Sequence, residues 1–223
     1  DLARQHFEEA LKYDPENVQA LFQMGVIFRD EARKHEPKSK ERRLLLVEAE
    51  ARFLKALSIR NDLLDDQGES VWASLGGVYQ RLESYNEAID AYRRATRVKK
   101  SSYPYNNLGL LYMEKGQYDE MRRNYGLVRL FAYAKVNYLD PGDEWAHNDL
   151  LVALLVEGRL DTIDDTLRNV LIIGEDYSLS SLKSTLERLH GKQNALAQDV
   201  SQSLPAIIDL IEAELNVRKA FNA

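Results

Sequence analysis

The sequence predicts an all-α fold, a solenoid in which antiparallel helix pairs stack one after another. Three observations carry this prediction. Gly and Pro are few, at 11 and 5 of 223 residues. Apolar side chains recur at spacings of three and four, which place them on one face of a helix. One pattern also recurs with a period of about 34 residues, which is typical of arrays that bury their apolar faces by stacking neighbouring units.

The clearest unit of the pattern lies within residues 69–101. Its first helix carries Trp72, Leu75, Gly76 and Tyr79, and its second carries Ala88, Tyr92 and Ala95. The first-helix set recurs as Tyr105, Leu108, Gly109 and Tyr112 in the next unit, and as Leu21, Met24, Gly25 and Phe28 in an earlier one. A small residue lets the second helix of a unit approach closely, as we expect at Gly76 and Gly109. We expect Gly116 and Gly158 at the turns between helices.

The pattern divides the chain into a half repeat, four repeats and a C-terminal cap. The solenoid covers 1–177, with the half repeat at 1–17 and repeats at about 18–63, 69–101, 102–143 and 144–177, and the capping helices of the same domain cover 178–223. Roughly 12 residues beyond the regular period fall around 31–43, where Pro37 and Ser39 favour a loop or a broken helix. About eight more fall around 119–129, where no turn residue intervenes, so we expect about two added helical turns there.

The last segment of the chain loses the repeat pattern and carries a broken leucine seam. We expect Ser203, Leu204 and Pro205 to open the final helix, because proline is well tolerated in a first helical turn. We interpret the segment as capping helices, which a solenoid requires for solubility. A dimerisation surface stays open as the alternative, in which the protein is a homo-oligomer through its C-terminal helices.

The composition excludes several classes of protein. The chain contains no cysteine, so it has no disulfide framework, no cysteine-ligated zinc or iron–sulfur site and no thiol nucleophile. A net charge of −6 argues against a nucleic-acid partner, since such domains are normally basic. No run of about 18 apolar residues occurs, so we expect no membrane insertion.

The repeating pattern resembles the tetratricopeptide repeat, a helix–turn–helix unit of about 34 residues with the consensus W-x2-L-G-x2-Y, A-x3-F, A and P. The unit from Trp72 to Ala95 matches this consensus in full except for the terminal proline, where Lys100 stands. The resemblance implies a right-handed α-solenoid of antiparallel helix pairs. It also implies a non-enzymatic adaptor that binds a partner protein or peptide segment.

In this family the first helix of each unit lines a concave groove that receives the partner. Carried onto this chain, the resemblance implies these contact residues: Phe22, Val26, Arg29, Gln80, Tyr103, Asn106, Asn107, Leu110, Met113, Trp145, Asn148 and Val152. Apolar and aromatic side chains predominate, so the groove suits an amphipathic helix or an extended apolar peptide. Asn106 and Asn148 would bind its backbone. In an alternative interpretation, the C-terminal helices fold back and fill the groove near Trp145.

One subclass of the family clamps acidic C-termini with lysine and asparagine at fixed groove positions. This chain carries Phe22 and Val26 at those positions in the first unit, and Ala73 and Gly77 in the second. Asn107 alone matches the asparagine of the middle unit. We therefore do not expect a carboxylate clamp.

No constellation of residues points to catalysis, a metal or a cofactor. The four histidines are far apart in the sequence. An S-x-x-K sequence at 180–183 lacks the companion motifs of the penicillin-binding enzymes. In the acidic stretch that begins at Asp62, Gly68 is not at the sixth position of a calcium loop and the final glutamate of the loop is missing. We predict that the protein is not an enzyme and uses no cofactor.

Two other functions stay open, namely a self-assembling scaffold joined through its ends and the regulatory or substrate-recruiting region of a larger enzyme. The absence of cysteine fits both cytoplasm and periplasm, and the cytoplasm is the compartment we favour. Because residue 1 is Asp rather than Met, we expect that an N-terminal targeting sequence can precede this chain.

Overall fold

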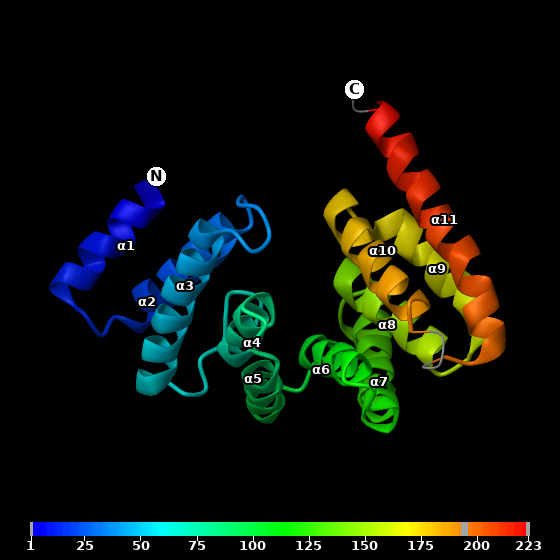
Figure 1. Ribbon diagram of the computed structural model, residues 1–223, viewed down its shortest axis with the longest axis horizontal. Helices are drawn as coiled ribbons and strands as arrows, with labels where there is room; N and C mark the ends of the chain where they lie inside the picture. The colour runs from blue at the N-terminus through cyan, green and yellow to red at the C-terminus, as the bar shows by residue number, and fades with distance from the viewer. Residues whose placement is uncertain (1, 193–195, 222–223) are drawn as a thin grey trace. The chain divides into compact units, whose positions relative to one another are not determined.

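The computed structural model describes residues 2–192 and 196–221, and its regular elements there are helices (Figure 1). They are α1 Leu2–Tyr13, α2 Val18–Ala32, α3 Lys40–Ile59, α4 Val71–Arg81, α5 Tyr85–Val98, α6 Ser102–Glu114, α7 Tyr118–Ala134, the π-helix η1 Lys135–Leu139, α8 Glu144–Val156, the 3-10 helix η2 Leu160–Thr162, α9 Ile163–Ile173, α10 Asp176–His190 and α11 Gln198–Phe221. The all-α prediction is confirmed. Within the described ranges, none of these helices has the length and apolar character needed to cross a bilayer.

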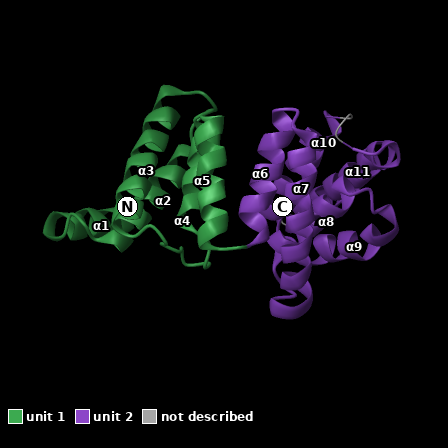
Figure 2. Ribbon diagram, turned by 90° about the horizontal axis from the view of Figure 1, so that it is seen from below, with its two compact units in different colours: residues 1–100 green, residues 101–223 purple. Residues whose placement is uncertain are grey.

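The chain forms two compact units (Figure 2), residues 1–100 and residues 101–223. In unit 1, α2 packs against α3, α4 packs against α5, and α3 and α4 connect the two pairs. In unit 2, α6 packs against α7, α8 against α7 and α9, and α10 against α11 and α8. The predicted division into a solenoid at 1–177 and a cap at 178–223 stays a prediction. Part of that cap, residues 193–195 and 222–223, lies outside the described residues.

Three helix pairs share one packing device, in which a glycine of the first helix faces an aromatic ring of the second. The pairs are Gly25 with Phe53, Gly76 with Tyr92 and Gly109 with Tyr125. A Cβ atom built on these glycines would lie 2.6 to 2.9 Å from the nearest ring atom, closer than real Cβ atoms pack. All three rings are fully buried. The prediction that Gly76 and Gly109 permit close approach of the helices is therefore confirmed.

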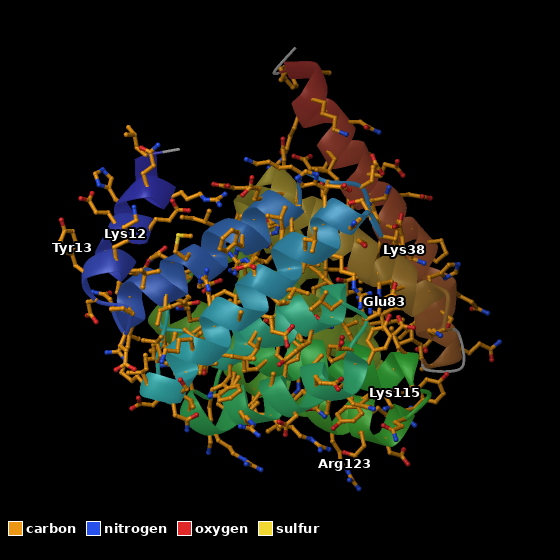
Figure 3. All side chains as sticks on the ribbon, turned by 60° about the vertical axis from the view of Figure 1, so that its left-hand side comes forward. Lys12, Tyr13, Lys38, Glu83, Lys115 and Arg123 are labelled. Atoms are coloured by element: carbon orange, nitrogen blue, oxygen red, sulfur yellow. The ribbon has the colours of Figure 1, made fainter. Side chains whose placement is uncertain are left out.

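The turns inside the repeats also share a backbone conformation. Gly116 and Gly158 have φ of 69° and 74°, which L side chains rarely adopt, so their predicted place at the turns is confirmed. In the turn between α4 and α5 the same position is held by Glu83, with φ of 63°. Figure 3 shows Glu83 facing Lys38, whose Nζ lies 4.0 Å from Oε1 of Glu83. Both side chains are largely exposed, so this ion pair contributes little.

The first predicted insertion takes the expected form only in part. Residues 33–39 form the connection between α2 and α3, whereas the rest of 31–43 is helical and α3 has 20 residues. Ser39 caps α3, where its side chain accepts a hydrogen bond from the backbone N–H of Arg42. The second extends a helix without a break: α7 has 17 residues and five more follow as η1, whereas α5 has 14.

The predicted start of the last helix is wrong. Helix α11 begins at Gln198, so Pro205 lies in its interior rather than in its first turn. Val200 and Leu204 are fully buried, and this burial extends the helix N-terminally past the proline. Pro205 is exposed, so the missing backbone hydrogen bond lies on the solvent side.

Candidate functional site

Unit 1 holds four of the predicted contact residues. Three are half-buried, namely Val26, Arg29 and Gln80. Phe22 is buried, and its ring centroid lies 6.0 Å from that of Phe53. Gln80 accepts a hydrogen bond of 2.8 Å from the Tyr92 hydroxyl. Arg29 pairs with the carboxylate of the next residue at 2.9 Å. Most of these groups therefore already make contacts inside unit 1.

A cleft of about 590 Å³ also opens on unit 1, between α1, α2 and α3. The Phe28 ring lies between the guanidinium groups of Arg4 and Arg52, at 5.0 and 5.9 Å. Both arginines pair with glutamates of the same unit. The charges that line this cleft are thus largely compensated within the protein.

Three apolar residues that were predicted to line the groove in unit 2 are buried, namely Leu110, Met113 and Val152. Together with Phe22 they belong to the packed core, and we no longer count them as contact residues. The reason is visible along α8, where residues 146–156 are buried without interruption because other helices cover several of its faces. Spacing within one helix cannot predict which of its faces a distant helix will cover.

The three asparagines of unit 2 that were predicted as contact residues use amide N–H groups internally. Asn106 donates to Asp149 at 2.7 Å, and Asn148 donates to the backbone carbonyl of Ser178 at 3.2 Å. Asn107 donates to a carbonyl of its own helix at 3.0 Å. The Oδ1 atoms of Asn106 and Asn148 are buried and have no hydrogen-bond partner among the described residues. The two asparagines expected to bind a peptide backbone therefore use an N–H internally and have enclosed oxygens.

Helix α10 accounts for part of this burial. At its N-terminus, Glu144 of α8 accepts hydrogen bonds from the Ser178 hydroxyl and from the backbone N–H of Glu175, both at 2.6 Å. At the other end, Arg188 and Lys192 lie 3.2 and 3.3 Å from the carboxylate of Glu114 on α6. Helix α10 therefore packs on α8 while Trp145 stays 43% exposed, and the alternative in which the C-terminal helices fill the groove near Trp145 stays a prediction. These exposed ion pairs contribute only about 0–1 kcal/mol each.

Tyr125 has a buried hydroxyl without a hydrogen-bond partner among the described residues. In the preceding pair, Tyr92 donates to Gln80, four residues after Gly76. The residue four after Gly109 is Met113, whose thioether is only a weak acceptor. Burial raises the pKa of the Tyr125 hydroxyl, and the Asp149 carboxylate raises it further, while Arg188 lowers it. This hydroxyl therefore stays protonated.

Three aromatic side chains of unit 2 are exposed, and each holds the same position in its helix. Each is the second residue of its helix: Tyr103 in α6, Trp145 in α8 and Tyr177 in α10. Their exposed fractions are 41%, 43% and 62%. The rings of Trp145 and Tyr177 contact each other edge to face, with centroids 5.8 Å apart. We call these three residues the aromatic row.

Sequence reasoning found Tyr103 and Trp145 but missed Tyr177. The repeat pattern fades after Asp176, so α10 was not aligned with the earlier first helices. A usable signal was present, because Tyr177 follows an acidic helix start just as Trp145 does. Aligning the acidic helix starts, instead of the glycine and alanine positions, would have located Tyr177.

Carboxylates surround the two acidic helix starts of the row. Asp143 and Glu144 precede Trp145, and Glu175 and Asp176 precede Tyr177. Over residues 140–176 the acidic side chains far outnumber the basic ones, which are Arg159 and Arg168. No group of three His, Asp or Glu side chains among residues 2–192 and 196–221 is placed to hold a metal ion.

A family comparison identifies the repeats. The tetratricopeptide-repeat model matches residues 69–102 and 103–127. Residues 69–127 therefore carry tetratricopeptide repeats. The matched segments are the α4–α5 pair and most of the α6–α7 pair, which carry the Gly76 and Gly109 packing. Tetratricopeptide repeats are helical interaction modules, so the chain is in general a protein-binding adaptor.

No curated protein matches the chain. Among solved structures, one of MamA is 20% identical with a TM-score of 0.49, and covers 78% of this chain and 88% of its own. A second MamA structure is 21% identical with a TM-score of 0.47, and covers 75% and 79%. YrrB, described as a tetratricopeptide-repeat protein with an unusual peptide-binding site, is 17% identical with a TM-score of 0.49, and covers 96% and 97%. Similarity at this level carries no functional argument.

Proposed function

We propose that the protein is a non-enzymatic adaptor that binds a peptide segment of a partner protein at the aromatic row of unit 2. The observation that carries the proposal is the exposure of Tyr103, Trp145 and Tyr177 at one position of three inner helices. Most large apolar side chains predicted for the groove are buried, whereas these three are not. Large aromatic side chains dominate the energetics of protein interfaces, because each buries much area at a low entropic cost.

One polar group of the row supports a peptide as the ligand. The side chain of Trp145 is 43% exposed and carries an indole N–H donor. A surface that combines exposed aromatic rings with a donor fits a peptide, whose backbone supplies one C=O per residue.

A capture experiment with matched variants tests this proposal. We expect proteins retained by the wild type to be lost by the Tyr103→Ala, Trp145→Ala double variant. They should be kept by Tyr138→Ala, since Tyr138 is 76% exposed but lies on η1, outside the row. Quantitative mass spectrometry gives the amount of each partner retained by a variant relative to the wild type. Circular dichroism checks that the wild type and the two variants are equally helical. Equal retention by the double variant contradicts the proposal.

A second candidate function is a self-assembling scaffold, which the exposed side of α11 favours. Leu210, Val217 and Phe221 are exposed at spacings of seven and four, so they form one stripe beside the buried face of that helix. We expect light scattering to show a mass that rises with concentration, and Val217→Glu to abolish the rise. A monomer at every concentration rejects this function.

A further inference from the structure

The start of helix α3 in unit 1 carries a concentration of positive charge. Residues 33–43 contain six basic and two acidic side chains, in a chain whose net charge is −6. Three of the basic residues, Lys40, Arg42 and Arg43, lie in the first four positions of the helix. The N-terminus of a helix carries a partial positive charge, which favours acidic side chains, and α7 and α9 each have two acidic residues in their first turn. The stability of α3 therefore does not explain its basic start.

The loop before α3 has a second feature that opposes stability. Lys38 has φ of 68°, in the left-handed region that residues with a side chain rarely adopt. Figure 3 shows this residue in the loop that leads into α3. Backbone strain and local choices that oppose stability cluster at functional sites. The two features lie within six residues of each other, so this end of α3 is a candidate functional surface.

Part of the positive charge is used inside the protein and part is not. Arg42 donates to a backbone carbonyl of the loop at 3.4 Å, and Arg33 lies 3.6 Å from a carboxylate of α2. Lys34, Lys40 and Arg43 are exposed, and none of the three has an ion-pair partner among the described residues. These three cations attract an anionic ligand and repel a cationic one.

An apolar stripe continues from these cations along the outer side of α3. Its members follow each other at spacings of three, four and three, which place them on one face of the helix, and they are Leu44, Val47, Ala51 and Leu54. The three larger side chains are 57%, 45% and 40% exposed. The opposite side of α3 is buried and packs against α2 and α4. The stripe is thus left exposed by the helices that pack on α3.

The form of the stripe favours a helix as its ligand. A helix that lies in a membrane interface has a broad apolar face, commonly with Trp or Phe. The stripe on α3 is instead a narrow seam with the spacing of a coiled coil, and it contains no aromatic residue. From Leu44 to Leu54 it extends over about 15 Å, or roughly three helical turns. A partner helix of that length or more can pack along the whole seam.

We propose that the outer face of α3 is a second docking surface, which binds an acidic amphipathic helix of a partner protein. The apolar side chains of that helix pack on the stripe, and its carboxylates face Lys34, Lys40 and Arg43. We call the stripe and these three cations the α3 surface. It shares no residue with the aromatic row, so this inference goes beyond the proposed function and does not depend on it.

Isothermal titration calorimetry with the full chain and designed peptides tests the inference. The probe is a helical peptide of three heptads, with leucine at the a and d positions and glutamate at the e and g positions. A scrambled peptide of the same composition keeps the charge and lacks the seam, and a peptide with lysine in place of glutamate keeps the seam and reverses the charge. We expect the probe to bind at least about tenfold more tightly than either control.

A charge reversal on α3 locates the binding. The Lys40→Glu, Arg43→Glu double variant should weaken the probe by at least about tenfold. The Lys99→Glu, Lys100→Glu double variant makes the same change in charge at two exposed residues that follow α5, and should leave the affinity unchanged. Acidic residues suit the start of a helix, so the melting temperature of the α3 variant should stay the same or rise. A loss of binding in that variant is then not a consequence of unfolding.

A second variant tests the seam without changing any charge. Leu44→Ser, Val47→Ser should weaken the probe by about tenfold as well. The Tyr103→Ala, Trp145→Ala variant of the aromatic row should bind the probe like the wild type. These side chains are exposed, so the variants are expected to fold, and circular dichroism checks that.

Three outcomes would overturn the inference. If the scrambled peptide binds as tightly as the probe, the attraction is only electrostatic. If vesicles of phosphatidylserine and phosphatidylcholine bind through Lys40 and Arg43 while the probe does not bind, the ligand is an anionic membrane. If light scattering shows a dimer that Leu44→Glu abolishes, a second copy of the chain covers the stripe. None of these outcomes changes the capture experiment on the aromatic row, so the two proposals succeed or fail separately.

Discussion

The α4–α5 pair of unit 1 and the α6–α7 pair of unit 2 are two versions of one repeat that differ at single positions. Both pack a glycine against a buried tyrosine, Gly76 on Tyr92 and Gly109 on Tyr125. They differ in what the tyrosine hydroxyl meets, because Tyr92 donates to Gln80 and the hydroxyl of Tyr125 lacks a partner among the described residues.

They differ again at the turn between their helices. The left-handed position is Glu83 in the first pair and Gly116 in the second. The same backbone hydrogen bonds close both turns, from Ser84 to Tyr79 at 2.9 Å and from Gln117 to Tyr112 at 2.8 Å. The left-handed turn is thus kept even where glutamate replaces glycine. The first pair has a partner for its tyrosine hydroxyl, and the second pair has glycine at its turn.

Removing the feature that both pairs share should have the largest effect. Gly109→Ala places a Cβ atom 2.6 Å from the buried Tyr125 ring, and we expect it to lower the free energy of unfolding by about 1–3 kcal/mol. Gly76→Ala should act in the same way on the other pair. Chemical denaturation measures both changes.

The control for this prediction lies in the same unit. Gly126 is inside α7, and a Cβ atom there would be 3.8 Å from the nearest atom, a Glu157 carboxylate oxygen. Gly126→Ala should therefore stabilise the protein by about 0.5–1 kcal/mol through helix propensity alone. Destabilisation of equal size by Gly126→Ala and Gly109→Ala would contradict the packing argument.

Exchanging the turn residues should have opposite effects in the two pairs. Glu83→Gly relieves a left-handed backbone at a residue with a side chain, and we expect a gain of about 0.5–1 kcal/mol. Gly116→Ala introduces that strain and should cost about 1 kcal/mol. Thermal unfolding of both variants shows whether each substitution raises or lowers the stability of the protein.

The ion pair of Glu83 needs its own control in that experiment. Lys38→Ala removes the partner of Glu83 and leaves the turn unchanged, so its expected effect is near zero. If Glu83→Gly instead costs about as much stability as Lys38→Ala does, the ion pair rather than the backbone decides the stability of this turn.

The repeat itself could be predicted from the sequence because its requirements are local. The close approach at Gly76 and Gly109, the turns at Gly116 and Gly158 and the extended α7 each follow from a few neighbouring residues. Periodicity and residue size carry this information directly.

The candidate site could be predicted only in part, because it depends on helices far apart in the sequence. Leu110 and Val152 have the apolar character expected of a groove lining, but both are buried. The burial of α8 depends partly on its packing against α10, which lies later in the sequence. Tyr177 belongs to a helix that lacks the repeat signature. Pro205 was misplaced for a similar reason, since the burial of Val200 against another helix extends α11 past it.

Removing the tyrosine hydroxyls should give the smallest effects and the sharpest contrast between the pairs. Tyr92→Phe leaves Gln80 without its donor, and we expect a loss of about 0.5–1 kcal/mol. Tyr125→Phe deletes a buried polar group that has no partner among the described residues, so its effect should be neutral or stabilising by up to about 1 kcal/mol. Parallel urea titrations with equal slopes compare the two directly. A loss for Tyr125→Phe as large as that for Tyr92→Phe would mean that the Tyr125 hydroxyl is satisfied in solution, and the two pairs would then differ only at their turns.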